Sequence, residues 1–237
     1  MGDLAAFVIA GGQSTRMGRD KAFLTLGGST LLERALAVAR CVSQEVTIVG
    51  QREKFAVYGS VIEDVYPGQG PLAGIHAALS ASAFELNLMI GVDTPFLDPK
   101  FVQYLVQQAR TSGATVTVPV TRVVSPGSRV PRKGLPHAVS EIPHPISPPH
   151  SASGQAPPGE IRVGQPQPLC AVYRREFAAV AENALRQGRN PIVPLFAGVA
   201  TREIGDVEMQ ELAFDPRMFD NLNTPEEWDQ ACRRAHR

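Results

Sequence analysis

The residues best suited to chemistry follow the first apolar run of the chain. Residues 5–10 have the composition of a buried strand, and Gly11 and Gly12 come directly after it, with Arg16 and Lys21 close behind. Glycine lets backbone N–H groups approach a ligand, and such groups bind phosphate. In a chain without net charge, these glycines and the two cations predict a local site for a polyphosphate, where charge-assisted hydrogen bonds are strongest.

Two familiar phosphate-binding patterns do not fit this stretch. It contains no G-x-G-x-x-G, and the run from Gly12 to Gly18 is one residue too long for a P-loop and lacks the G-K-[ST] ending. From the residues alone, a plain glycine turn with solvated Arg16 and Lys21 remains the alternative.

Two carboxylates follow other predicted strands. Asp93 ends the apolar run 86–92, and the carboxyl end of a central strand is where open α/β sheets bind ligands. Its oxygens suit Mg²⁺, which proteins usually hold with one or two carboxylates and substrate phosphate oxygens. Asp64 follows a predicted strand, precedes a second glycine-rich turn at 67–75, and can accept hydrogen bonds from a base or sugar. A turn cap at Asp93 and an exposed loop acid at Asp64 are the alternatives.

Elements able to position these residues alternate along the chain. Short β-rich runs alternate with amphipathic stretches, which predicts an α/β fold with a mostly parallel central sheet and helices on both faces. The expected strands are 5–10, 45–49, 86–92, 114–119 and 169–173. The expected helices are 30–41, 71–81, 99–110, 174–187 and 225–237, several of which begin with proline in the first turn.

Length and composition narrow the class of protein. The 237 residues, 43% of them hydrophobic, predict a single domain, and 23 basic against 23 acidic side chains remove any bulk attraction to nucleic acid. The first apolar run is too short to span a bilayer and no basic stretch precedes it, so we expect a cytoplasmic protein without membrane contact. The cysteines form no C-x-x-C pair, so we expect them to be reduced.

Residues 124–167 differ from the rest of the chain. They hold 10 of the 20 prolines and three of the five histidines but no aromatic residue. Such a segment cannot build a core, and we expect a proline-rich, disordered insertion that interrupts the domain. Metal binding by His137, His144 and His150 is not favoured, because closing such a site would require ordering a proline-rich chain.

Four stretches together resemble the molybdenum cofactor guanylyltransferase family of nucleotidyltransferases. The family pattern L-A-G-G-x-S-x-R-M-G-x-D-K is matched from Ile9 to Lys21 with isoleucine in place of leucine. The stretches 70–75 (G-P-L-A-G-I), 93–96 (D-T-P-F) and 219–227 (F-D-N-L-N-T-P-E-E) also look like family motifs. The resemblance covers the chain except for the insertion, and it departs at Gly50, where relatives often carry an asparagine near the base.

The resemblance implies a Rossmann-like fold and a specific reaction. Such an enzyme joins the phosphate of molybdopterin to the α-phosphate of GTP with Mg²⁺ and releases pyrophosphate. By position, the resemblance assigns the nucleotide to Ile9, Ala10, Gly11 and Gly12, the phosphates to Arg16 and Lys21, the guanosine to Asp64, the metal to Asp93 and the pterin side to Asn221 and Asn223. It also implies delivery to molybdoenzymes or other proteins of cofactor biosynthesis.

The expected chemistry is electrostatic. A phosphate monoester with a second pKa of about 6 is largely dianionic at neutral pH, so the reaction needs no general base. We therefore expect Arg16, Lys21 and Asp93 to be the catalytic residues, and His76 and Cys170 to pack in the core. A related enzyme that uses CTP or a sugar phosphate remains an alternative. A second alternative is a non-catalytic binding module whose proline-rich insertion recruits a partner.

Overall fold

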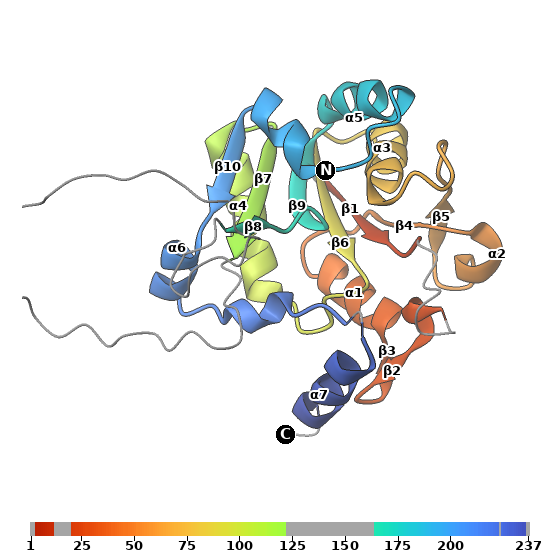
Figure 1. Cartoon of the computed structure of the whole chain (residues 1–237), viewed down its shortest axis with the longest axis vertical. Helices are drawn as coiled ribbons and strands as arrows, with labels where there is room; N and C mark the ends of the chain where they lie inside the picture. Colours follow the sequence, from red (N-terminus) through yellow and green to blue (C-terminus); the bar gives the residue numbers. More distant parts are fainter. Residues whose placement is uncertain (1–2, 12–19, 122–163, 223, 236–237) are drawn as a thin grey trace, which may run out of the picture.

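A twisted central sheet forms the middle of the molecule (Figure 1). The computed structural model describes residues 3–11, 20–121, 164–222 and 224–235. Among these residues an eight-stranded sheet has the order β10-β7-β9-β6-β1-β4-β5, with β8 paired to β7. Its strands are β1 (Leu4–Ile9), β4 (Val46–Val49), β5 (Ser60–Ile62), β6 (Leu86–Gly91), β7 (Val116–Thr121), β8 (Gln165–Pro166), β9 (Cys170–Arg174) and β10 (Thr201–Ile204).

The sheet is mostly parallel, as expected. The pairs β1–β4, β1–β6, β4–β5 and β7–β10 are parallel, whereas β9 runs antiparallel to both of its neighbours, β6 and β7. A separate antiparallel ribbon joins β2 (Thr25–Leu26) to β3 (Ser29–Thr30).

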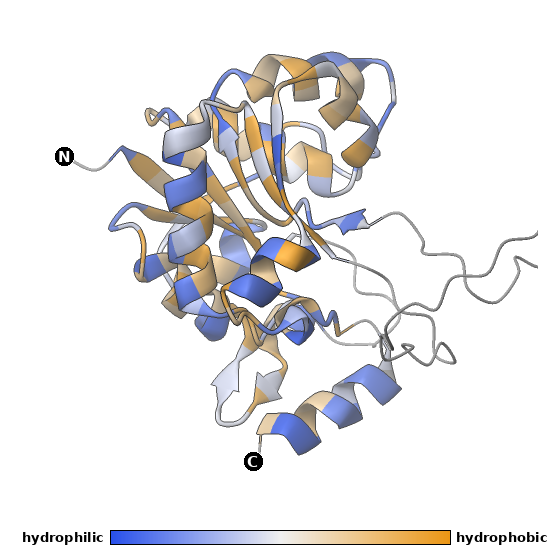
Figure 2. Cartoon of the chain, turned by 90° about the vertical axis from the view of Figure 1, so that its left-hand side faces the viewer, coloured by the Kyte–Doolittle hydropathy of each residue, from blue (hydrophilic) through white to orange (hydrophobic). Residues whose placement is uncertain are grey.

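Helices cover both faces of the sheet and bury two apolar clusters. On one face, α1 (Leu31–Arg40) packs on β1, β4 and β6 and α4 (Pro99–Ser112) on β6, β7, β9 and β10, and the buried cluster there includes Ala6 and Val8 of β1. On the other face, α3 (Pro71–Ala81) packs on β1 and its neighbours and against α5 (Phe177–Arg186), and the cluster there includes Phe7 of β1. Figure 2 shows the resulting contrast between mainly apolar strands and the mainly polar α7 (Pro225–Ala235) near the C-terminus. The predicted fold class is confirmed.

The chain changes direction across the sheet at β1. It moves outward from β1 to β4 and β5, and then returns to place β6 on the opposite side of β1. The carboxyl ends of β1 and β6 therefore flank the point at which the strand order reverses, which is the usual ligand-binding position in open α/β sheets.

Most predicted elements are present with ends shifted by a few residues. The helix expected at 30–41 begins after Thr30, whose side chain caps Glu33 in a reciprocal capping box, and the helix at 71–81 has the expected bounds. Elements that the sequence did not predict are short: α2 (Arg52–Phe55), α6 (Asp206–Glu211), β10 and the β2–β3 ribbon. The sequence of the edge strand β10 shows little alternation of apolar and polar residues, because three of its four residues are Thr201, Arg202 and Glu203. The strand therefore gave no clear pattern in the sequence.

The proline-rich segment lies largely outside the described residues. Its last part is described, and there Gln165 and Pro166 form β8, paired with Thr121 and Val120 of β7. The chain is therefore part of the sheet again slightly before residue 167. Within the described ranges, no helix is long and apolar enough to cross a membrane.

Candidate functional site

The carboxyl ends of β1 and β6 lie side by side. The register pairs Ile9 with Gly91, so Gly11 and Asp93 leave neighbouring strands at the same edge of the sheet. The N–H groups of Ala10 and Gly11 both donate to the carbonyl oxygen of Val49, at 2.9 and 3.1 Å. These two amides are therefore engaged within the sheet in this structure.

Lys21 returns to this edge on a short 3-10 helix, η2 (Lys21–Phe23). The side chain of Asp20 caps this helix by accepting the N–H of Ala22 at 3.3 Å, and it pairs with Lys54 at 2.9 Å. Lys21 is only 9% exposed, which is unusual for a lysine because burial disfavours its charged form.

The charged groups of Asp93 and Glu227 interact with that of Lys21. Burial lowers the pKa of Lys21 below its usual range, and the negative charges of Asp93 and Glu227 oppose this decrease. Lys21 and Asp93, which the sequence places far apart, are thus close enough to interact. Arg16, the third expected catalytic residue, lies outside the described residues.

Asp93 is held through its backbone, and its carboxylate lies close to Lys21. Its carbonyl oxygen accepts the N–H of Leu222 at 3.2 Å, which fixes the C-terminal part of the chain beside it. The half-buried carboxylate interacts with the charge of Lys21, and no group of three His, Cys, Asp or Glu side chains able to hold a metal occurs in the described ranges. The residues present fit Mg²⁺, which commonly takes one carboxylate and completes its shell with phosphate oxygens and water.

Asp64 lies beside the ends of β1 and β4. Its Oδ1 is 3.6 Å from the point that a Cβ on Gly74 would occupy, and side-chain atoms of Ile9 and Val49 are each 3.5 Å from that point. A Cβ at position 74 would therefore be in ordinary van der Waals contact with these groups, beside which the first turn of α3 packs. Burial raises the pKa of Asp64.

Gly50 shows why this chain departs from the family pattern. Its N–H donates to the carbonyl oxygen of Ile62 at 2.9 Å, and a Cβ at this position would lie 2.7 Å from the ring of Phe55. Phe55 is 1% exposed and stacks on Phe23 of η2 with ring centroids 5.5 Å apart. The ring of Phe55 therefore occupies the space that a side chain at position 50 would need. Its stacking on Phe23 also packs η2, which carries Lys21, against this part of the core. Sequence reasoning missed this role.

We call residues 215–222 and 224–235 the C-terminal arm. Asn221 lies next to Leu222, whose N–H reaches Asp93, and it lines a cavity of about 780 Å³ together with Phe96, Glu227 and Arg234. Glu227, in the first turn of α7, forms a reciprocal cap with Thr224: its N–H donates to Oγ1 of Thr224 at 3.2 Å and its carboxylate accepts the Thr224 N–H at 3.0 Å. The sequence predicted this helix start but not the proximity of Glu227 to Lys21.

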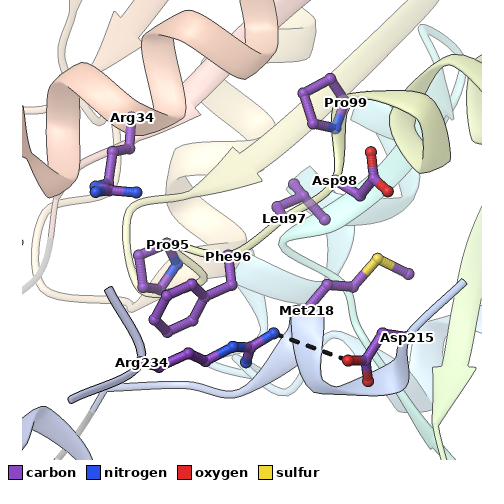
Figure 3. Close-up of a pocket in the computed structure, with 9 residues that line it drawn as sticks. All are labelled: Arg34, Pro95, Phe96, Leu97, Asp98, Pro99, Asp215, Met218 and Arg234. Carbon is purple, nitrogen blue, oxygen red and sulfur yellow. Dashed lines mark ion pairs between the residues drawn. The ribbon is translucent and has the colours of Figure 1, made fainter. Parts of the chain in front are cut away.

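Arg234 fastens the arm to the loop after Asp93. Its guanidinium lies 4.2 Å from the centre of the Phe96 ring, and it donates to the carbonyl oxygen of Arg217 at 3.1 Å. Two carboxylates stand nearby, Asp220 at 3.6 Å and Asp215 at 4.0 Å. Figure 3 shows Arg234 extended between Phe96 and Asp215 along a second, smaller pocket of about 380 Å³.

The structure thus brings most of the predicted site residues to one edge of the sheet. They are Ile9, Ala10, Gly11, Lys21, Asp64, Asp93 and Asn221, whereas Gly12, Arg16 and Asn223 lie outside the described residues. His76 and Cys170 are buried, as expected; burial lowers the pKa of His76 and raises that of Cys170.

Comparison with known proteins decides the family. The model of the MobA-like NTP transferase domain matches residues 6–198. The chain belongs to this family. It is a nucleotidyltransferase, as the sequence predicted.

The alignments to individual relatives cover nearly the whole chain. A probable molybdenum cofactor guanylyltransferase from Pelotomaculum thermopropionicum is 29% identical over 221 residues, covering 92% of this chain and 86% of the relative. The crystal structure of molybdopterin-guanine dinucleotide biosynthesis protein A from Archaeoglobus fulgidus has a TM-score of 0.70 at 22% identity, with 98% of each chain covered. A cytidylyltransferase from Thermus thermophilus that acts on 2-C-methyl-D-erythritol 4-phosphate shares the fold at a TM-score of 0.63 and 20% identity, again over 98% of each chain.

Proposed function

We propose that this chain transfers GMP from GTP to the phosphate of molybdopterin and releases pyrophosphate, forming the guanine dinucleotide form of the molybdenum cofactor. The observation that carries the proposal is the meeting of Lys21 and Asp93 at the adjacent carboxyl ends of β1 and β6, in a member of the MobA-like family. A cation and a carboxylate at this position are what a triphosphate and its divalent ion need.

The acceptor phosphate oxygen attacks the α-phosphorus of GTP, and the bond from that phosphorus to the oxygen bridging to the β-phosphate breaks. The acceptor is already largely ionised at neutral pH because its second pKa is about 6. The chain therefore needs no proton-abstracting residue, which agrees with the burial of His76 and Cys170. Its work is to align two anions and to offset their repulsion.

Lys21 supplies a poorly hydrated positive charge for the phosphates. Because its side chain is buried, its interaction with an anion is screened less than that of a surface lysine. Arg16 is proposed to assist it. Asp93 would hold Mg²⁺ through its carboxylate, and the ion, when bound, would neutralise charge on the reacting phosphates.

The two substrates would lie on either side of this centre. Ile9, Ala10, Gly11 and Gly12 would contact the nucleotide, and Asp64 would accept hydrogen bonds from the guanosine. Asn221 and Asn223 would face the acceptor, for which the cavity beside Asn221 offers room. Molybdoenzymes or other proteins of cofactor biosynthesis are the proposed recipients of the product.

The test supplies the full chain with molybdopterin-loaded acceptor protein, Mg²⁺ and each of the four ribonucleoside triphosphates in turn. Mass spectrometry then identifies the nucleotide attached to the pterin. We expect GMP from GTP together with one equivalent of pyrophosphate. Attachment of CMP instead would identify the cytidylyl alternative, and GTP binding without product would favour a binding module.

A further inference from the structure

The close approach of Asp93 to Gly91 is the tightest contact at the proposed metal position. A Cβ added to Gly91 would lie 2.5 Å from Oδ1 of Asp93, well inside the distance at which carbon and oxygen repel each other. The carboxylate of Asp93 therefore lies back over the end of its own strand, in space that exists because residue 91 has no side chain.

Backbone conformation does not explain this glycine. Gly91 is absent from the described glycines with positive φ, and it ends β6 as an ordinary strand residue paired with Ile9. Its N–H donates to the carbonyl oxygen of Leu169 at 2.7 Å. An alanine could adopt the same backbone, so the requirement at this position is for space alone.

The carboxylate is the part of this contact that can yield. Strand β6 is fixed between β1 and β9, whereas Oδ1 stands at the end of a short side chain that turns about χ1. The same Cβ would lie 3.2 Å from Cβ of Leu169, which requires a shift of only a few tenths of an ångström. A methyl group at position 91 would therefore move the carboxylate rather than the sheet.

We propose that Gly91 is a positioning residue, which sets the place of the Asp93 carboxylate for a divalent ion by leaving free the space above the end of β6. The inference rests on the proposed function, because it gives Asp93 the metal. Residues that orient a metal ligand commonly change metal affinity by 10- to 100-fold when altered.

The first test measures Mn²⁺ binding to the full chain in the presence of GTP by electron paramagnetic resonance. We expect Gly91→Ala to weaken Mn²⁺ binding on the order of tenfold, with GTP binding in the absence of metal changed little. Gly205→Ala is the matched control, because no atom lies within 4 Å of a Cβ there and φ is −86°. Wild-type Mn²⁺ affinity in folded Gly91→Ala would overturn the inference.

A thermal-unfolding cycle tests the contact itself. If the added methyl group meets the carboxylate, the loss of melting temperature caused by Gly91→Ala becomes smaller in an Asp93→Ala background, where Oδ1 is absent. An equal loss in both backgrounds would contradict the inference even if Gly91→Ala binds metal poorly.

Asp93→Ala distinguishes the proposed metal role of Asp93 from the proposed positioning role of Gly91. If it retains wild-type Mn²⁺ binding with GTP, the metal role in the proposed function fails. If Asp93→Ala loses binding while Gly91→Ala does not, only the role of Gly91 fails.

Discussion

The two sides of the site are held in place by different kinds of contact. On the proposed nucleotide side, Ile9, Gly11 and Asp64 stand at the ends of β1 and β5 or just beyond them, and strand register and buried apolar packing fix their places. On the proposed acceptor side, Asn221 and Glu227 belong to the C-terminal arm, which contains no strand of the sheet and which contacts the loop after Asp93 through its backbone and Arg234. The arm is also held by buried apolar side chains that belong to the core, namely Met218, Phe219, Leu222 and Ala231.

Asp93 belongs to both sides. Its strand places it beside β1, and its carbonyl oxygen receives the arm through Leu222. The comparison teaches that strand register fixes the proposed nucleotide side, whereas the proposed acceptor side is fixed by side-chain packing of the arm and by its contacts to the loop 93–96. Changes on the two sides should therefore affect different kinetic constants.

The largest effect is expected at the shared residue. Asp93→Ala should lower kcat by about 10²-fold or more, the size of effect seen when one strong electrostatic stabiliser is removed. The backbone contact to Leu222 survives in this variant, so circular dichroism should show an intact fold. Turnover near wild type at saturating Mg²⁺ would remove Asp93 from the centre of the site.

A smaller effect is expected at Lys21, on the nucleotide side. Lys21→Met keeps much of the buried stem but removes the charge, and should weaken GTP binding about 10- to 100-fold, the value of a charge-assisted hydrogen bond. Isothermal titration with GTP checks this, and Lys100→Met, at an exposed lysine on α4, is the control. If Lys21→Met binds GTP as wild type does, the phosphates lie elsewhere.

The acceptor side can be loosened without touching the nucleotide side. Arg234→Ala removes the contacts to Phe96 and Arg217, which are worth about 1 kcal/mol. We expect a few-fold increase in KM for the acceptor with KM for GTP unchanged, while Arg40→Ala, an exposed arginine on α1, changes neither. Equal increases in both KM values would show that the two sides are not separate.

The smallest effect concerns stability and pH. Because burial raises the pKa of Asp64 above its ordinary 3.8, ionising this carboxyl destabilises the fold as pH rises through the raised value, whereas below the ordinary value it carries no such penalty. Asp64→Asn should therefore raise the melting temperature by about 1–3 °C at pH 7 and change it little at about pH 3.5.

Calorimetry at the two pH values checks this prediction. Glu53→Gln, at an exposed residue of α2, is the control and should change the melting temperature by the same small amount at both pH values. If Asp64→Asn raised the melting temperature only at low pH, the effect would have the opposite pH dependence, and burial of an ionised Asp64 could not be its cause.

The sequence predicted the arrangement at the ends of β1 and β6 better than the path of the C-terminal arm. An apolar run followed by glycine or aspartate predicts where a strand ends, and the parallel sheet then brings Gly11 and Asp93 together. No such pattern reveals that the N–H of Gly11 is already engaged by Val49, because that depends on where β4 ends.

Contacts between distant parts of the chain left no signal in the sequence. Glu227 was predicted only as an acid in the first turn of a helix, and its approach to Lys21 follows from the path of the arm. The departure at Gly50 was visible in the sequence, but its reason, the ring of Phe55, was not.

The most direct measurement is a crystal structure of the chain with Mn²⁺ and a non-hydrolysable GTP analogue, in which anomalous scattering locates the ion. The geometry predicts an ion coordinated by an Asp93 oxygen and by phosphate oxygens, with Nζ of Lys21 at hydrogen-bond distance from the same triphosphate. A triphosphate bound away from Lys21, or an ion on carboxylates other than Asp93, would contradict it.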